Sequence, residues 1–542
     1  MNLDDIEGQK IFDHMKTLCN FGYRWAGTKP ALQAEDYIFN ELKKVGVSDV
    51  QMEEYTFRRW WAEEYNLKIL RESVPALTED LVIDSFPVWL SGSTEKEGIT
   101  AEIIYAGNGT SVDFERISVE KKIVLVEGKM ILNFHPSYTD RGFDSLNLAK
   151  ENGALGAIFI NNSPLDYITY IFFMSMFGWK RRLPALSINN IDGNYLKKLS
   201  LSHDFTPKVR LVQWVKTEKA PSKFIVGTLP GQSDDILLVG THTDSTFTGA
   251  MDNAAANAGL IEIARYFAGI PEKKREKTLK FVGWTGHEAG LIGVNVFTKT
   301  HQDMLNNICT FIMLDGLASN GYYNQADGGV IATGRDEKRG LFITDNAILT
   351  PIVMDATLKY DLLPAAYVSA KTLPVSDLGP FVFSNVPCIM VIGKSIFYHT
   401  KGDTIDKVPP DRLERATKAH IEIIEKIMEV PKDKIIEADG KLENLKQFIE
   451  KKEGVEPPSG FFDILPHPIP IGYSAIFHPT VFTCPESIAI DFEWDFGDGN
   501  TSNTILTKHE YDIPGKYDVK FTVTDNFGNV GIINREVRVI KN

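Results

Sequence analysis

The stretch THTDSTFTGAMDNAAANAGL, Thr241 to Leu260, places a histidine and two aspartates between a predicted strand and a predicted helix. The preceding apolar run, DDILLVG, is short and rich in branched aliphatic residues, which is typical of a buried strand. His242 and Asp244 follow at its carboxyl end, and Asp252 lies near the first turn of the predicted helix. Open α/β sheets carry their chemistry at the carboxyl ends of strands, so this stretch marks the expected functional site.

The pair formed by His242 and Asp244 suits a metal ion. A neutral imidazole binds a metal through one nitrogen, while a nearby carboxylate accepts a proton from the other nitrogen and orients the ring. A strand-end histidine beside a capping aspartate would give the same pattern without a metal. Further ligands elsewhere in the chain therefore decide between the two interpretations.

Ligand-type residues also follow other predicted strands. Glu288 follows LKFVGW at the expected start of a helix, Asp315 follows TFIML, and His399 lies beyond VPCIMVIG. Because the carboxyl ends of parallel strands share one edge of a sheet, we expect these residues to converge with His242 and Asp252. Nitrogen and oxygen ligands without a thiolate suit two divalent ions bridged by one carboxylate, and imidazole favours zinc.

Length and composition restrict the class of protein. The chain has 542 residues, of which 43% are hydrophobic, and a formal net charge of −14. This length predicts about three domains, and this hydrophobic content excludes a disordered chain. The negative charge argues against non-specific binding of nucleic acid. The cysteines are scattered without a Cys-x-x-Cys pair, which indicates neither a disulfide framework nor a thiolate metal site.

Two stretches bear on location. The N-terminus, MNLDDIEGQKIFDHM, lacks the basic start and apolar core of a signal peptide, so we expect the chain as written to be cytoplasmic. An incomplete N-terminus would leave an extracellular location open. Residues 167–179, YITYIFFMSMFGW, are strongly apolar but shorter than the roughly 20 residues of a membrane-spanning helix. We interpret them as a flap or buried helix over the site, with a homodimer contact and a membrane-surface contact as alternatives.

The order of predicted elements divides the chain into five segments. Residues 1–95 and 223–430 alternate helices with apolar strands, which predicts one α/β domain with a mixed sheet flanked by helices. Residues 96–222 contain mostly short strands and form an inserted β-rich domain. Residues 431–465 are a charged helical segment with a linker, and residues 466–542 are all-β in character.

Two of these segments resemble known domains. In the insert, IVLVEG, GALGAIFI and PALSINNIDGNYL occur in an order that resembles the protease-associated (PA) domain, which implies a lid or a wall that restricts substrates. WDFGDG followed by HEYDIPGKYDVKFTVTD closely resembles the PKD (polycystic-kidney-disease) domain, an immunoglobulin-like β-sandwich. This second resemblance implies a spacer or a module that binds a protein, a carbohydrate or a membrane surface. Asp495 and Asp498 in this module favour turn formation over calcium binding.

The blocks HTDS, GAMDN, HEAGLIG, LDG and YHTKGDT, preceded by RWAGT, resemble the zinc exopeptidases of the aminopeptidase Y and glutamate carboxypeptidase family. The resemblance implies a zinc exopeptidase-like fold and a two-zinc site that hydrolyses peptide bonds with a metal-activated water. It also implies a bridging Asp252 and a strained, often cis, peptide bond to Asn253. The implied ligands are His242 and Asp315 for one ion, Glu288 and His399 for the other, with Asp244 as the partner of His242.

The sequence departs from this family at residue 287. The family has two consecutive glutamates where this chain has His287 and Glu288, and the first glutamate is the implied general base. Histidine is a poorer proton carrier beside two dications, because their charge disfavours imidazolium. Three hypotheses follow: a peptidase with a weaker base, a divergent subfamily with altered chemistry, and a metal-binding or interaction protein without turnover.

For a working enzyme, the resemblance implies that the zinc pair polarises the scissile carbonyl and stabilises the oxyanion. Tyr398, beside His399, is a candidate for a further hydrogen bond and equally a candidate for packing. An aminopeptidase holds the substrate α-amine with acidic residues, whereas a carboxypeptidase needs a cationic clamp. No cationic residue is placed by motif near the ligands, which favours an aminopeptidase over a carboxypeptidase.

Overall fold

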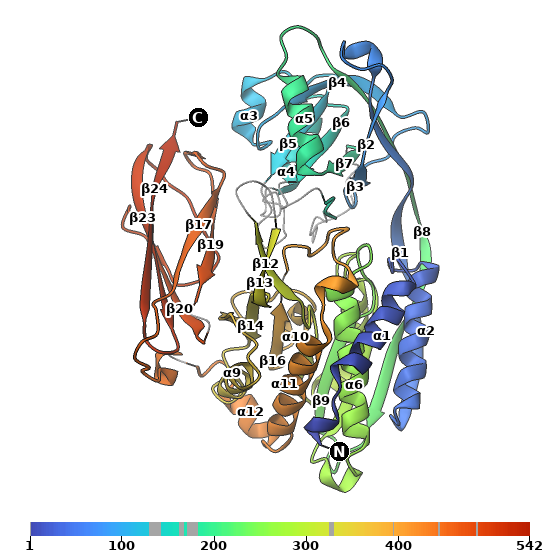
Figure 1. Cartoon of the computed structure of the whole chain (residues 1–542), viewed down its shortest axis with the longest axis vertical. Helices are drawn as coiled ribbons and strands as arrows, with labels where there is room; N and C mark the ends of the chain where they lie inside the picture. The colour runs from blue at the N-terminus through green and yellow to red at the C-terminus, as the bar shows by residue number, and fades with distance from the viewer. Residues whose placement is uncertain are drawn as a thin grey trace.

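The computed structural model describes residues 2–128, 142–161, 167–170, 183–324, 330–393, 395–442, 445–483 and 486–541. Figure 1 shows three parts: a mixed sheet with helices at the bottom, a smaller α/β unit at the top and a β-sandwich at the left. We call them the main domain (residues 2–69 and 208–438), the insert (residues 81–200) and the sandwich (residues 459–540).

The main domain is built on a mixed sheet. Its central strands are parallel and continuously apolar, as expected for strands that are buried on both faces. In order across the sheet, the strands are β1 (Asp49–Ile69), β8 (Lys208–Leu229), β10 (Thr278–Trp284), β9 (Ile236–His242), β11 (Ile308–Met313), β16 (Cys388–Gly393), β14 (Arg339–Ile343) and β15 (Ala365–Ser369). A separate antiparallel pair consists of β12 (Asn320–Asn324) and β13 (Val330–Asp336).

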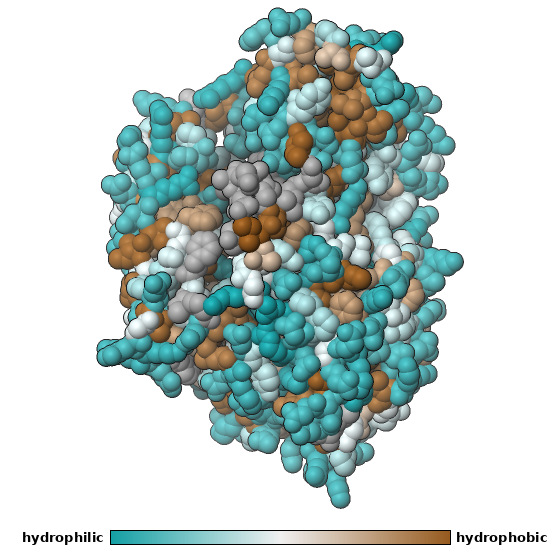
Figure 2. All heavy atoms as spheres, viewed as in Figure 1, coloured by the Kyte–Doolittle hydropathy of each residue, from teal (hydrophilic) through white to brown (hydrophobic). Residues whose placement is uncertain are grey.

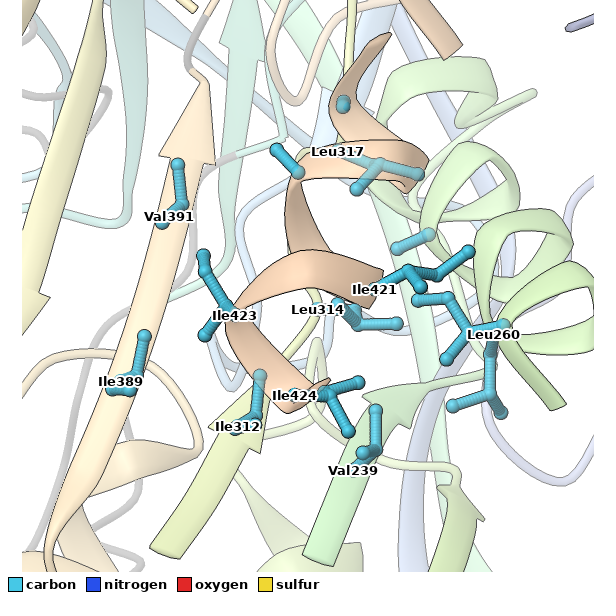
Figure 3. Packing of buried hydrophobic residues seen from close by; sticks show 14 of the residues in the cluster. Val239, Leu260, Ile312, Leu314, Leu317, Ile389, Val391, Ile421, Ile423 and Ile424 are labelled. Atoms are coloured by element: carbon cyan, nitrogen blue, oxygen red, sulfur yellow. The ribbon is translucent and has the colours of Figure 1, made fainter. Parts of the chain in front are cut away.

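Helices cover both faces of this sheet. Figure 3 shows Val239 of β9 and Ile312 of β11 beneath Ile424 in the helix that spans Pro410–Met428. Burying such an aliphatic side chain contributes about 1.5–3 kcal/mol. On this face lie α1 (Gly8–Asn20), α2 (Lys29–Lys44), α6 (Ala256–Ala268), α9 (Leu349–Lys359), α11 (Pro410–Met428) and α12 (Lys432–Ala438). On the opposite face lie α7 (Ile292–Thr300), α8 (Gln302–Leu305) and α10 (Leu378–Phe383).

The insert is carried on two long strands. β1 and β8 pair along almost their whole length, and Figure 1 shows them running from the main domain up to the insert. The insert sheet has the order β3 (Ser85–Pro87), β7 (Ala185–Ile188), β6 (Gly156–Asn161), β5 (Ile123–Gly128) and β4 (Ile99–Tyr105), and β2 (Leu81–Ile83) pairs with β1. Its helices are α3 (Ser111–Arg116), α4 (Gly142–Glu151) and α5 (Asn190–Ser200).

The predicted division of the chain stays a prediction, and two features bear on it. β3 pairs with β7 although it precedes residue 96, where we placed the start of the insert. β8 continues without a break through residue 222, where we placed the end of the insert. A strand that serves both units leaves no change of pattern at their junction, so the sequence cannot mark that point.

The sandwich packs two sheets around Trp494, Phe477 and Phe521. One sheet contains β17 (Ser459–Leu465), β19 (Ala475–Phe482) and β22 (Thr507–His509). The other contains β21 (Thr501–Ser502), β20 (Ile488–Asp495), β23 (Gly515–Asp525), β24 (Val530–Ile540) and β18 (Ile469–Pro470). β20 also pairs with the edge strand β15 through Ala365 with Ile488 and Ala366 with Ala489. The sandwich therefore extends the main sheet.

The surface and the helices bear on the membrane alternatives. Figure 2 shows mostly hydrophilic residues over the lower part of the face in view, where the main domain lies. Within the described ranges, every helix is too short or too polar to cross a membrane. Residues 171–179 of the predicted apolar flap lie outside the described residues, whereas residues 167–170 lie within them.

Candidate metal centre

The carboxyl edge of the main sheet holds a buried cluster of histidines and carboxylates. β9 ends in this cluster, and the loops that follow β10, β11 and β16 contribute to it. Because these strands are parallel neighbours, their loops meet at one edge. The structure brings together all the ligands named from the sequence, each at most 1% exposed: His242, Asp252, Glu288, Asp315 and His399.

Asp252 lies between the other candidate ligands. Its Oδ1 is 3.2 Å from His242 Nε2, and its Oδ2 is 3.2 Å from His399 Nε2. His242 Nε2 is also 3.7 Å from Asp315 Oδ1, and His399 Nε2 is 3.2 Å from Glu288 Oε2. One oxygen of Asp252 therefore faces a histidine–aspartate pair, and the other faces a histidine–glutamate pair.

Several acceptor atoms of this cluster are buried without a hydrogen bond. Within the part of the chain that the structure describes, these are His242 Nε2, Asp315 Oδ1 and both carboxylate oxygens of Asp252 and of Glu288. A buried polar atom left unsatisfied costs about 1–3 kcal/mol, so native proteins rarely keep one without a partner. Ligand atoms of His242, Asp252 and Glu288 lie within 4.8 Å of one another. Divalent cations bound by imidazole and carboxylate would satisfy these atoms, so the residues present fit a metal site.

The backbone around Asp252 is irregular. Ala250–Ala255 form a π-helical turn in which Asp252 and Asn253 have non-helical angles, and α6 begins only at Ala256. Asp252 therefore lies in the helical turn that leads directly into α6, near the helix start, as predicted. The peptide bond between Asp252 and Asn253 is cis, which confirms the expectation from the family resemblance.

Two buried residues, Asp403 and Arg24, hold this segment in its non-helical conformation through hydrogen bonds to its backbone. Asp403 Oδ1 accepts a hydrogen bond from the amide of Met251 at 2.8 Å, and Asp403 Oδ2 accepts one from the amide of Asp252 at 3.1 Å. Burial and the nearby charge of Asp252 raise the pKa of Asp403 to about 7, although the amide donors oppose this rise. Arg24 donates to the carbonyl of Gly249 at 2.9 Å.

Asp244 supports the centre in a different way from the one we predicted. His242 Nδ1 lies 3.1 Å from the backbone carbonyl of Asp244, in hydrogen-bond geometry, and 3.5 Å from the nearer carboxylate oxygen. The carboxylate of Asp244 accepts hydrogen bonds from the backbone amides of His287, at 3.3 Å, and of Glu288, at 3.0 Å. Because these amides point to Asp244, Glu288 lies in a turn before α7, which begins at Ile292, and not at the helix start.

His287 stands at the position of the implied general base. Its ring stacks on His242, with centroids 4.0 Å apart and planes inclined by 10°. His287 Nδ1 is 3.1 Å from Asp377 Oδ1, and Asp377 Oδ2 accepts a hydrogen bond from Trp284 Nε1 at 2.6 Å. Burial and the charge of His242 lower the pKa of His287, but the carboxylates of Asp377 and Glu288 together outweigh both, and the net shift is upward.

Tyr398 and His399 lie against each other. The ring of Tyr398 is 5% exposed, belongs to the hydrophobic core and stacks on His399 with centroids 3.7 Å apart. This geometry suits packing, and a catalytic hydrogen bond from Tyr398 stays a prediction. His399 has a φ of 58°, in the left-handed region that residues with a Cβ rarely adopt. Such a conformation persists only where the surrounding structure imposes it.

The charges of the centre stabilise one another. Burial opposes protonation of the histidines, but the surrounding carboxylates outweigh it and raise the pKa of His399 to about 9. The same balance raises the pKa of His242 well above its usual value. Burial would raise the pKa of Asp252, yet the two histidines hold it well below its ordinary range. A bound metal ion would take over the role of these protons.

Sequence reasoning missed three supporting residues: Ser376, Asp377 and Asp403. Ser376 Oγ donates to Asp315 Oδ2 at 2.8 Å, and Asp377 faces His287. Both lie in LPVSDLGP, where a serine–aspartate pair before a short helix has the pattern of an ordinary cap. Asp403 lies in the block YHTKGDT, and its place in that motif is the signal that could have identified it as a supporting residue.

The fold and the site together define an α/β protein with a histidine–carboxylate metal centre at the carboxyl edge of a mixed sheet. Within that class, residues 225–424 match the model of peptidase family M28, and residues 471–539 match the model of the PKD domain. Residues 225–424 are therefore similar to peptidase family M28 and residues 471–539 to the PKD domain, as the sequence resemblances indicated. The likeness of the insert to a PA domain stays a prediction.

Individual relatives agree with these matches. Leucine aminopeptidase 2 of Arthroderma otae is 25% identical over 343 residues, which cover 61% of this chain and 63% of that protein. Carboxypeptidase Q of Xenopus laevis is 23% identical over 406 residues, which cover 72% of this chain and 79% of that protein. The structure of BSAP, a zinc aminopeptidase from Bacillus subtilis, covers 81% of this chain and 100% of its own, with a TM-score of 0.61 and 19% identity. This structural likeness establishes the shared fold, and the match to leucine aminopeptidase spans less than two thirds of that relative.

Proposed function

We propose that this protein is a zinc-dependent exopeptidase, and specifically an aminopeptidase, with two zinc ions. The observation that carries the proposal is the position of Asp252, whose two carboxylate oxygens each lie 3.2 Å from a histidine nitrogen. His242, Asp315 and Asp252 would hold one ion, and Glu288, His399 and Asp252 would hold the other. The similarity to leucine aminopeptidase 2 supports the proposed aminopeptidase activity.

The chain supplies the geometry for such a reaction. When bound, the zinc ions would polarise the scissile carbonyl and lower the pKa of water. Asp403 orients Asp252 through two amide hydrogen bonds, and Asp244 orients Glu288 through another. Ser376 orients Asp315 directly, because its hydroxyl donates a hydrogen bond to the Asp315 carboxylate. Because these groups are buried, their electrostatic interactions are strong and need little reorganisation during the reaction.

His287 and Asp377 form the proton-accepting pair of the proposal. A carboxylate that holds the Nδ1 proton of a histidine leaves Nε2 as the acceptor and stabilises the imidazolium that forms. His287 Nδ1 and Asp377 Oδ1 lie 3.1 Å apart, at ion-pair distance but without hydrogen-bond geometry, and we propose that this contact becomes such a hydrogen bond during the reaction. It offsets the unfavourable charge of the metal ions beside His287. We therefore favour a peptidase with a histidine base over a protein that has lost turnover.

The preference for the amino terminus rests on a described cation beside the bridging segment, Arg24. A carboxypeptidase needs a free arginine or lysine to bind the terminal carboxylate of its substrate. Arg24 is buried beside this segment, but its terminal nitrogens donate to the backbone carbonyls of Leu18, Thr248 and Gly249. The guanidinium is thus engaged in supporting the main chain, which favours an aminopeptidase.

Metal analysis and peptide cleavage test the proposal. The full chain, prepared without chelator, should contain close to two equivalents of zinc and should release the first residue of unblocked peptides. Acetylation of the peptide amine should abolish cleavage, whereas amidation of the carboxyl end should not. Asp252→Asn should reduce zinc content by at least one equivalent, because the bridging charge is lost. Asp345→Asn, which alters a carboxylate bound to Tyr367 and Ser369, is the control.

The alternatives predict other results. Cleavage that requires a free carboxyl end would indicate a carboxypeptidase, as the name of one relative suggests for that relative. Zinc uptake without cleavage of any peptide in a library would indicate a binding protein that has lost turnover. Absence of zinc uptake would reject the metal centre altogether.

Partners beyond a peptide substrate stay predictions: a homodimer contact, and contacts of the sandwich with a protein, a carbohydrate or a membrane surface. The cytoplasmic location also stays a prediction. Light scattering during gel filtration would measure the oligomeric state, and flotation with anionic vesicles would test the membrane contact.

A further inference from the structure

A short strip of the insert, residues 167–170, reaches the metal centre. Within this strip Thr169 forms an antiparallel bridge with Thr400, next to the ligand His399. Ile168, Thr169 and Tyr170 are each at most 2% exposed. Backbone hydrogen bonds lie on both sides of the bridge, from Tyr170 N to His399 O at 2.8 Å and from Lys401 N to Ile168 O at 3.3 Å.

Tyr170 contacts the backbone of two candidate ligands at once. Its amide donates to the carbonyl of His399, and its hydroxyl donates to the carbonyl of Glu288 at 2.8 Å. Its ring makes edge contacts with His399, at 5.9 Å between centroids, and with Trp25, at 5.3 Å. Glu288 and His399 both lie on the Oδ2 side of Asp252. A single residue of the insert therefore touches two of the three ligands of one proposed zinc position.

The strip is held from both of its sides. In β7 of the insert, Ser187 Oγ donates to the carbonyl of Thr169 at 3.1 Å. On the main-domain side, the Tyr167 ring packs against Phe397 with centroids 5.7 Å apart. A Cβ at Gly402 would lie 3.1 Å from the Tyr167 ring, so a glycine at this position permits the close approach. These contacts fix Tyr170 relative to both units.

The conformation of His399 gives this contact an energetic role. Left-handed backbone angles are unfavourable for a residue with a Cβ, and His399 has a φ of 58°. The hydrogen bond from the Tyr170 amide restrains the carbonyl of that same residue. If this support weakens, His399 and Glu288 relax before metal binding, and the metal ion must restore their positions.

We propose that Tyr170 is a positioning residue that couples the insert to the zinc position formed by Glu288 and His399. The inference rests on the proposed function above, because it concerns one of the two proposed zinc ions. It makes the insert a part of the metal centre, in addition to any restriction of substrate access.

Tyr170→Phe tests this role, because it removes the hydroxyl and keeps the ring and the backbone amide. Tyr105→Phe is the matched control: it removes a hydroxyl of the insert that donates to Glu127 at 2.6 Å, away from the centre. Zinc affinity is measured for both full-length variants by competition with a chromophoric chelator. We expect Tyr170→Phe to weaken one zinc equivalent about tenfold and to leave the other unchanged. Tyr105→Phe should bind zinc like the unmodified chain.

A second measurement does not depend on metal. In zinc-free protein, amide hydrogen exchange of residues 286–292, around Glu288, should be faster in Tyr170→Phe than in Tyr105→Phe, because only the hydroxyl that bonds Glu288 is lost. Equal exchange and equal zinc affinity in the two variants would overturn the inference and leave the proposed function intact. If the unmodified chain takes up no zinc, the proposed function fails, and the exchange of residues 286–292 still decides whether Tyr170 restrains this loop.

Discussion

His287 Nδ1 lies 3.1 Å from Asp377 Oδ1, which joins the position of the general base to a loop on the opposite side of the centre. Trp284 fixes the second oxygen of Asp377 by a hydrogen bond of 2.6 Å. The preceding residue, Ser376, supports the candidate ligand Asp315. One loop before α10 therefore orients both a ligand and the residue that replaces the expected glutamate.

Asp377→Asn should lower kcat about 100-fold while zinc content and KM change little. An amide can present its NH₂ group to His287 Nδ1, which selects the tautomer that leaves Nε2 protonated and unable to accept a proton. Steady-state kinetics on an unblocked peptide, together with metal analysis, measure this split. An unchanged kcat would show that Asp377 does not orient a base, and Asp345→Asn should have no effect on kcat.

The effect of His287→Glu on kcat should depend on which residue stands at position 377. Alone, it places a carboxyl group beside the Asp377 carboxylate, and repulsion between like charges keeps one of the two protonated, so that less free base is present. Combined with Asp377→Asn, the repulsion is removed, and kcat should exceed that of the unmodified chain by about tenfold or more. The double variant and both single variants form a cycle that measures this coupling. A double variant no faster than the unmodified chain would contradict the idea that histidine is the weaker base here.

Glu35→Gln should stabilise the main domain at alkaline pH. Glu35 is fully buried, accepts a hydrogen bond from Ser222 at 2.9 Å, and has a pKa raised by burial to about 7. The unfolded chain ionises this group near its ordinary value of 4.5. Between these two values the unfolded state loses a proton that the folded state keeps, so native stability falls as the pH rises.

Glutamine has no such titration and can still accept the hydrogen bond from Ser222. We expect Glu35→Gln to exceed the unmodified chain in unfolding free energy by about 1–3 kcal/mol at pH 8, with a smaller difference at pH 5. Urea unfolding at both pH values measures this difference. The same difference at the two pH values would mean that ionisation of Glu35 is not its cause.

Ile490→Ala should loosen the sandwich from the main domain. Ile490 lies on β20 of the sandwich, is 1% exposed, and packs with the core of the main domain. Its truncation should lower the free energy of unfolding by about 2–3 kcal/mol. Calorimetry should then resolve separate transitions for the two parts. Ile532→Ala, at a side chain that is 59% exposed, should leave the trace unchanged.

Much of the main domain could be predicted because its strands and ligands leave local patterns. The run before His242 is apolar throughout, and the structure has β9 there. WDFGDG and the strands after it predicted the sandwich, and the matched PKD region confirms it. The helix start predicted at Glu288 was wrong, because Glu288 lies in a turn whose amides donate to Asp244, and α7 begins only at Ile292.

The sequence by itself determined which residues bind metal in the proposal and the order in which strands deliver them, because periodicity, turn residues and motif order are local properties. Only the tertiary structure decided that His287 meets Asp377 and that Tyr170 meets Glu288, 118 residues away. Both contacts depend on the paths of loops and on packing between separate units. Those paths follow from the free energy of the whole fold, so no periodic pattern in the sequence records them.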